Sequence, residues 1–129
     1  MPKASKQTAT GGGDFGPVSD RNAEFDGYTV NFVTFHEDID ATPLMKGLPD
    51  DQCQCPHWGY VLSGRVHYRL ADGTEETMEA GDAFYLSPGH VPFKHEPGTQ
   101  IVQWSPTHEL RETDEAIMRN MQAMGAPAS

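Results

Sequence analysis

Turn-forming residues interrupt the second half of the sequence at short intervals. Ser63-Gly64, Asp72-Gly73 and Gly81-Asp82 each favour a tight turn, and residues 87–92 hold two prolines and a glycine. This spacing leaves room only for strands of a few residues between successive turns. Short strands separated in this way are typical of sandwiches and barrels, so we predict an all-β fold.

Apolar, β-branched and aromatic runs between the turns predict the strands. We expect strands over residues 28–35, 54–62, 65–70, 74–78, 83–86 and 99–104. Val66, Tyr68 and Leu70 alternate with charged or polar side chains, which predicts one buried and one solvated face for that strand. Residues 38–52 carry Asp, Pro and Gly and are predicted to form a loop.

The chain of 129 residues fits one domain, within which we expect three segments. Residues 1–20 are rich in Gly, Thr, Ser and Lys and predict a flexible tail, residues 21–106 the β-barrel, and residues 107–125 a C-terminal helix. Thr107 can cap the helix. One helix face carries the apolar side chains Leu110, Ile117, Met121 and Met124. We expect this amphipathic helix to cover a sheet face; the alternative is a Met-rich surface for a partner.

The strong negative charge limits the classes of binding partner. The formal net charge is -10 and the pI is near 4.8, so nucleic acid and anionic membranes would repel the surface. No apolar run approaches the roughly 20 residues of a membrane span, and the first ten residues lack the apolar stretch of a secretory signal. We therefore expect a cytoplasmic protein that binds neither nucleic acid nor membrane.

The only two cysteines, Cys53 and Cys55, are one residue apart. In an extended strand their Cα atoms would lie roughly 6.6–7 Å apart, at the upper limit for a disulfide. Such a bridge would also close a very small loop, which stabilises little. Two thiols on one face are better explained as metal ligands or as small buried hydrophobic side chains.

His57 extends this pair to the positions i, i+2 and i+4. In a regular strand Cys53, Cys55 and His57 would leave the same face. His90, thirty-three residues further on, offers another imidazole on a constrained turn. Thiolate and imidazole suit Zn²⁺, and also Fe²⁺, Co²⁺, Ni²⁺ or Cu. For each residue the simpler alternative is an inert buried thiol or a hydrogen-bonded histidine.

Two motifs in this region resemble those of the cupin superfamily. They are His57-x-x-Tyr60-Val61-Leu62-x-Gly64 and Gly81-Asp82 followed by Pro88-Gly89-His90-x-Pro92, and the resemblance covers residues 28–104. It implies a small jelly-roll β-barrel with one metal inside. It also implies the reaction types of small cupins: oxygenation, isomerisation, cyclisation or lyase chemistry.

The motifs depart from the usual set of three His and one Glu. His57 falls where the family has its Glu, and Asp51 and Cys53 fall where it has paired His, with Cys55 as an alternative. The usual His of the second motif falls at Pro92, and His90 precedes it by two residues on the same strand face. A subgroup of small cupins with Cys-x-Cys-Pro-His and Pro-Gly-His motifs is similar. The expected ligand set is therefore Cys53, Cys55, His57 and His90.

The number of cysteines in that set decides the chemistry. Two Cys and two His would close a four-coordinate, structural zinc site, whereas one Cys and two His would leave a position for water or substrate. Zinc is our first choice, with Fe, Ni, Co, Cu or Mn as alternatives. The two functional hypotheses are a metal-dependent enzyme acting on an oxygen-bearing small molecule, and a non-catalytic small-molecule or metal-binding module with a structural metal.

The remaining candidates have simpler explanations. His95 has the opposite strand parity from His90, His67 alternates with arginines, and His36 ends a strand. His108 is expected to be exposed at the helix start, and Asp51 to form a turn. We also expect a homodimer, with the tail and the strand over residues 28–35 as the natural elements of exchange.

Overall fold

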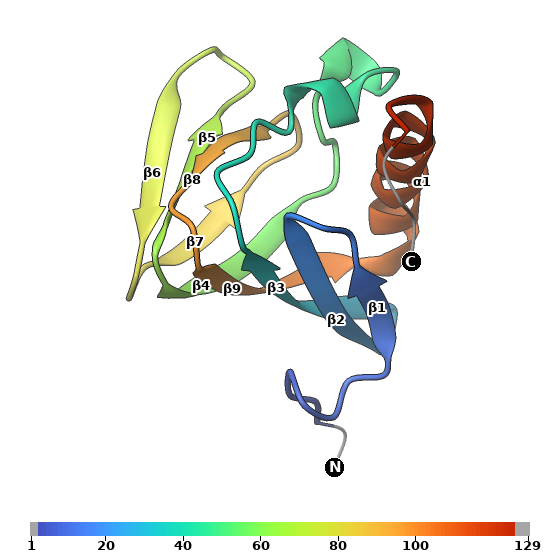
Figure 1. The fold of residues 1–129 in the computed structure, drawn as a ribbon, viewed down its shortest axis with the longest axis vertical. Helices are drawn as coiled ribbons and strands as arrows, with labels where there is room; N and C mark the ends of the chain where they lie inside the picture. Colours follow the sequence, from blue (N-terminus) through green and yellow to red (C-terminus); the bar gives the residue numbers. More distant parts are fainter. Residues whose placement is uncertain (1–2, 126–129) are drawn as a thin grey trace.

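The structure is a computed structural model that describes residues 3–125. These residues form two antiparallel sheets and one C-terminal helix (Figure 1). The larger sheet has the order β1 (Gly11–Asp14), β2 (Val18–Phe25), β3 (Tyr28–Phe35), β9 (Thr99–Pro106), β4 (His57–Ser63) and β7 (Ala83–Leu86). The smaller sheet has the order β6 (Glu75–Glu79), β5 (Arg65–Arg69) and β8 (Val91–His95). Two 3-10 turns, η1 (Thr42–Met45) and η2 (Pro49–Asp51), precede β4, and α1 (Thr107–Ala123) follows β9.

The predominance of β-strands and the single C-terminal helix agree with the prediction. The two sheets form two walls that converge at one end of the molecule, and α1 stands beside the open end (Figure 1). The jelly-roll barrel remains a prediction, because the strand pairings define two separate sheets. No helix within residues 3–125 combines the length and apolar character needed to cross a membrane.

The core lies between the sheets and follows from the alternation of side chains along each strand. Val61 of β4 and Ile101 of β9 point inward from the large sheet, and Val66 and Tyr68 point inward from the small one. The buried cluster consists of Phe35, Val61, Val66, Tyr68, Met78, Phe84, Leu86 and Ile101. The alternation predicted for Val66 and Tyr68 is therefore confirmed.

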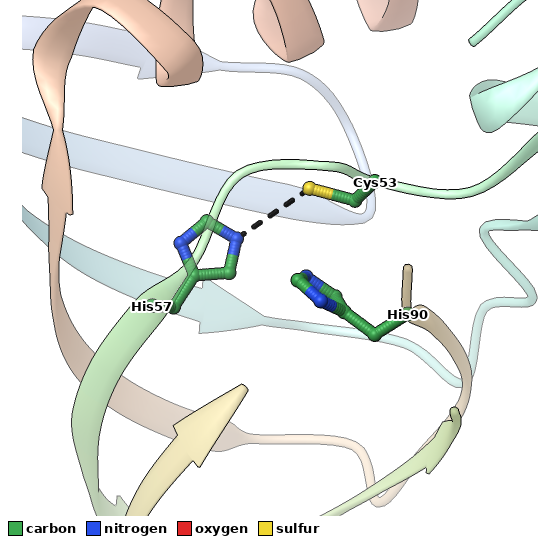
Figure 2. A group of neighbouring side chains, drawn as sticks. All are labelled: Cys53, His57 and His90. Atoms are coloured by element: carbon green, nitrogen blue, oxygen red, sulfur yellow. Dashed lines mark hydrogen bonds between the residues drawn. The ribbon is translucent and has the colours of Figure 1, made fainter. Parts of the chain in front are cut away.

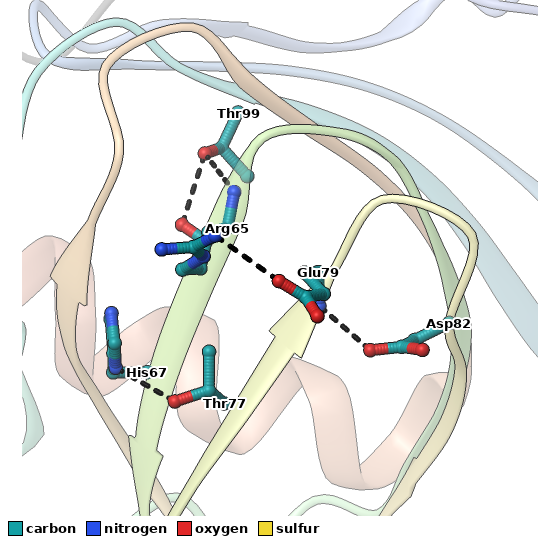
Figure 3. A network of polar contacts seen from close by, with 6 residues as sticks. All are labelled: Arg65, His67, Thr77, Glu79, Asp82 and Thr99. Carbon is teal, nitrogen blue, oxygen red and sulfur yellow. Dashed lines mark hydrogen bonds and ion pairs between the residues drawn. The ribbon is translucent and has the colours of Figure 1, made fainter.

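The outer face of the small sheet is polar and charged (Figure 3). Arg65 of β5 pairs with Glu79 of β6 at 3.2 Å, and the Nδ1 atom of His67 lies 2.9 Å from the hydroxyl of Thr77. The backbone N–H of Glu79 donates to Asp82, which closes the turn after β6. Exposed pairs of this kind contribute only about 0–1 kcal/mol each to the free energy of unfolding, so their main effect is to make this face hydrophilic.

The expectation of a flexible tail over residues 1–20 differs from the structure from residue 11 onward. Residues 1 and 2 lie outside the described residues, but β1 and the first part of β2 fall within the expected tail. β2 pairs with β3 along its whole length, from Val18 opposite Phe35 to Phe25 opposite Tyr28. The backbone ladder holds this polar segment in the sheet, and hydrophobicity alone does not report such pairing.

Two further strand boundaries differ from the prediction. The residues expected to form only a turn lead directly into β8, which begins at Val91 and pairs with β5. β4 begins at His57 rather than at Gln54. Pro56 has no N–H to donate to a ladder, so regular pairing starts after it, and the segment from Cys53 to Pro56 is irregular.

The helix forms where expected but makes different contacts. Thr107 does not cap it, because its hydroxyl is buried 2.7 Å from the hydroxyl of Thr29. α1 packs chiefly against η1, with smaller contacts to β9 and β3, and not across a sheet face. Asn120 anchors this contact by donating to the carbonyl oxygens of Leu44 at 2.7 Å and Lys46 at 2.9 Å.

Candidate metal centre

A cavity of about 500 Å³ lies between the two sheets and reaches α1. Its walls are mainly apolar and include Val33, Phe35, Ile39, Ile101, Leu110 and Ile117. The volume falls in the range of pockets that take small organic ligands, roughly 300–1,000 Å³. Cys53, His57 and His90 line the same cavity.

A backbone bridge brings Cys53 and His90 together. The N–H of Cys53 donates to the carbonyl of His90 at 2.9 Å, and the N–H of Gly89 donates to the carbonyl of Cys53 at 2.8 Å. Gly89 has a φ of +94°, and a Cβ atom there would lie 2.8 Å from the Cβ of Ala71. The turn therefore requires glycine, and this glycine sets the position of His90 opposite Cys53.

Cys53, His57 and His90, which we call the Cys-His-His group, point toward one another (Figure 2). One potential ligand atom from each residue lies within 4.8 Å of the others. The Sγ of Cys53 is 3.6 Å from the Nε2 of His57, and the two imidazole centroids are 5.0 Å apart. All three residues are buried, with exposed fractions between 2% and 6%.

Hydrogen bonds outside the group orient both imidazoles. The Nδ1 of His90 lies 2.8 Å from the carbonyl oxygen of Ser87. A carbonyl only accepts, so this Nδ1 carries the proton and the neutral ring offers its Nε2 lone pair. The Nδ1 of His57 lies 2.6 Å from the hydroxyl of Ser105. Metal-binding histidines typically engage their second nitrogen in this way, so the two rings fit a metal.

Burial sets the protonation states of the group. It lowers the pKa of His57 to about 3, with His90 as a smaller cause, and it lowers the pKa of His90 below the usual value. Both imidazoles are therefore neutral at pH 7, as metal ligands must be. Burial raises the pKa of the Cys53 thiol, which a divalent cation would counter by stabilising the thiolate. One sulfur and two nitrogens are a donor set that suits Zn²⁺ and the other metals considered above.

Cys55 stands apart from this group. Its side chain is completely buried, and its Sγ lies 3.4 Å from the carbonyl oxygen of Pro56 and 4.0 Å from that of Pro106. Burial raises the pKa of its thiol to about 12. The expectation that Cys53, Cys55 and His57 share one face requires a regular strand, and the irregular segment before β4 removes that condition. The structure thus brings together three of the four predicted ligands.

The other predicted side chains lie away from the group. His95 is buried against Phe35, with ring centroids 3.9 Å apart, and its Nδ1 lies 2.9 Å from the carbonyl of Ile39. His36 is exposed beside Ser19, and Asp51 accepts the N–H of Gly47 in a turn. His67 and His108 face the solvated side of β5 and the exposed start of α1.

Several polar residues near the group were not singled out from the sequence. The hydroxyl of Thr113 lies 3.4 Å from the Sγ of Cys53, and it occupies the helix face of Leu110, so helical spacing was the available signal. Asp20 and Asp114 line the cavity. Desolvation and the nearby Asp20 raise the pKa of Asp114. Asp114 is exposed on α1, and the surrounding water limits this rise.

Comparisons with known proteins agree with this fold. The family described as Cupin domain matches residues 53–104. The polyketide cyclase RemF from Streptomyces resistomycificus has 16% identity and a TM-score of 0.55, covering 83% of this chain and 80% of its own. An RmlC-like cupin from Shewanella frigidimarina has 17% identity and a TM-score of 0.53, covering 80% and 88%. The Clostridium difficile EutQ protein has 11% identity and a TM-score of 0.50 and covers 70% of this chain, which spans 62% of the EutQ chain.

No curated protein matches the sequence significantly. The Cupin domain match covers less than half of the chain, and the similar solved structures share its fold. At this level of identity the similar structures establish the fold alone, and activity has to be argued from the cavity and its residues.

Proposed function

We propose that the chain is a small single-domain metal-binding cupin that holds one divalent metal at Cys53, His57 and His90 and binds a small oxygen-bearing molecule beside it. The observation that carries this proposal is the convergence of these three side chains within one cavity, with ligand atoms within 4.8 Å of one another. Zinc is the first choice, because thiolate and imidazole are its usual protein ligands.

Three protein ligands favour a reactive site over a closed one. Zinc sites with three protein ligands keep a fourth position for water or substrate. A metal bound here would supply Lewis acidity to an oxygen of the ligand. His57 and His90 would be held in orientation by Ser105 and Ser87, and the apolar walls would exclude bulk water. The reaction would be of the oxygenase, isomerase, cyclase or lyase type.

The second candidate is a non-catalytic module in which a closed Cys₂His₂ metal site only stabilises the fold. The observation in its favour is the complete burial of Cys55 two residues from Cys53. Its sulfur lies outside the Cys-His-His group, however, and contacts backbone carbonyls instead. A shift of the irregular segment before β4 would be needed to close the site.

Metal analysis of single variants tests the proposal. Protein purified without added metal is expected to contain close to one equivalent of a divalent metal. Cys53→Ser, His57→Gln and His90→Gln should each lose most of it, while the matched variant Cys55→Ser should retain it. Absence of stoichiometric metal from the wild-type protein would overturn the proposal. Equal loss in Cys55→Ser, together with loss of folding, would favour the structural module.

A further inference from the structure

Tyr68 places a phenol beside the Cys-His-His group. It lies on β5 opposite Pro92 of β8, and only 3% of its surface is exposed. Its ring stands edge-on to His90, with centroids 6.1 Å apart and an interplanar angle of 82°. Tyr68 lines the same cavity as Cys53, His57 and His90.

The Tyr68 hydroxyl makes no side-chain hydrogen bond among residues 3–125, and its oxygen is not among the fully enclosed polar atoms that lack a partner, so it borders the cavity. Buried tyrosine hydroxyls usually find a hydrogen-bond partner, and a ligand in the cavity can supply one here. An ordinary phenol keeps its proton at pH 7, so this hydroxyl can act as the donor.

We propose that the Tyr68 hydroxyl donates a hydrogen bond to the metal-bound oxygen of the ligand, and that the ligand class is small apolar molecules with an anionic oxygen, such as a carboxylate, enolate or phenolate. This inference rests on the proposed metal site at Cys53, His57 and His90. A metal and a fixed donor that act on one oxygen both favour negative charge on it. The apolar walls fit the rest of such a molecule.

Benzoate binding to the Co²⁺-loaded protein tests the role of Tyr68. The visible bands of Co²⁺ report benzoate, and the sulfur-to-cobalt absorption reports the metal site itself. Tyr68→Phe should weaken benzoate binding about tenfold, the size of one hydrogen bond to a charged group, and leave Co²⁺ affinity unchanged. The matched control is Tyr60→Phe, which removes an exposed phenol from β4 of the large sheet and should change neither the benzoate affinity nor the Co²⁺ affinity.

Each outcome decides between the inference and the proposed function. Two results would overturn the inference alone, provided that Co²⁺ binds. The first is an unchanged benzoate affinity in Tyr68→Phe, and the second is a wild-type protein that does not bind benzoate. If Co²⁺ does not bind, the proposed metal site fails and the inference fails with it. Since a hydroxyl without a protein partner can be removed without loss of stability, unfolding of Tyr68→Phe would show that a protein partner exists and would also overturn the inference.

Discussion

At the scale of single residues, Gly89 combines two constraints that fix His90. Its φ of +94° disfavours any side chain, and a Cβ atom would also press on Ala71. Gly89→Ala is expected to lower the free energy of unfolding by about 1–3 kcal/mol and to weaken metal binding. Gly73→Ala is the control, since its φ of +86° is similar but its Cβ would meet no atom within 4 Å. Equal effects of the two variants, measured by urea unfolding, would refute the role of the Ala71 contact.

Ser105 acts on the site only through His57. Removing its hydroxyl frees the Nδ1 of His57 and lets the ring turn, so Ser105→Ala should weaken metal affinity by about 10- to 100-fold. Competition with a chromophoric chelator measures this affinity. Ser63→Ala, whose hydroxyl makes only a long 3.4 Å contact with Gly98, should leave it unchanged. An unchanged affinity in Ser105→Ala would mean that packing alone orients His57.

Burial of His57 predicts a pH dependence of the metal-free protein. The folded state lowers the pKa of His57 to about 3, whereas the unfolded chain has an ordinary value near 6.5. Between these pH values the unfolded state binds the extra proton, so stability is fully present above about pH 6.5 and falls with acidification. The contribution is about 1.4 kcal/mol per pH unit from this residue. His57→Gln should flatten the decline measured by urea unfolding, and His108→Gln, at an exposed position, should not.

At the scale of elements, one side chain fastens the helix to the loop beside the cavity. Asn120 of α1 donates to two carbonyl oxygens of the η1 segment, at Leu44 and Lys46. Asn120→Ala leaves both carbonyls without this donor and should lower the free energy of unfolding by about 1–3 kcal/mol. Gln122→Ala, at an exposed helix position, is the control. If chemical unfolding shows no difference between the two variants, water replaces the lost donors without cost.

The elements also show which sequence signals were sufficient. Period-two alternation predicted the inward positions of Val66 and Tyr68, because a half-buried strand leaves that pattern in any sequence. β1 and β2 left no such signal, since backbone pairing to β3 holds them. The sequence also predicted that His57 and His90 belong with a cysteine near one cavity. It could not separate Cys53 from Cys55, because that distinction arises from the irregular backbone before β4.

At the scale of the whole molecule, the hydrophobic core and the Cys-His-His group are largely separate. The main core cluster between the sheets includes none of the three ligands, and Cys53 belongs to the second cluster beneath α1. Removing the metal with a chelator should therefore lower the melting temperature, because the folded state loses the free energy of metal binding. The protein should nevertheless stay folded at 25 °C. Circular dichroism of chelated protein tests this expectation. Loss of the β-sheet signal at 25 °C would show that the metal is part of the folding unit.

A metal held by the Cys-His-His group would have a mechanical consequence. His57 begins a strand of the large sheet, and His90 immediately precedes a strand of the small sheet, so an ion shared between them would cross-link the two walls. The metal–ligand bonds would then resist a force that pulled the two sheets apart at the cavity. The ion would thus strengthen the molecule at the place where it is hollow.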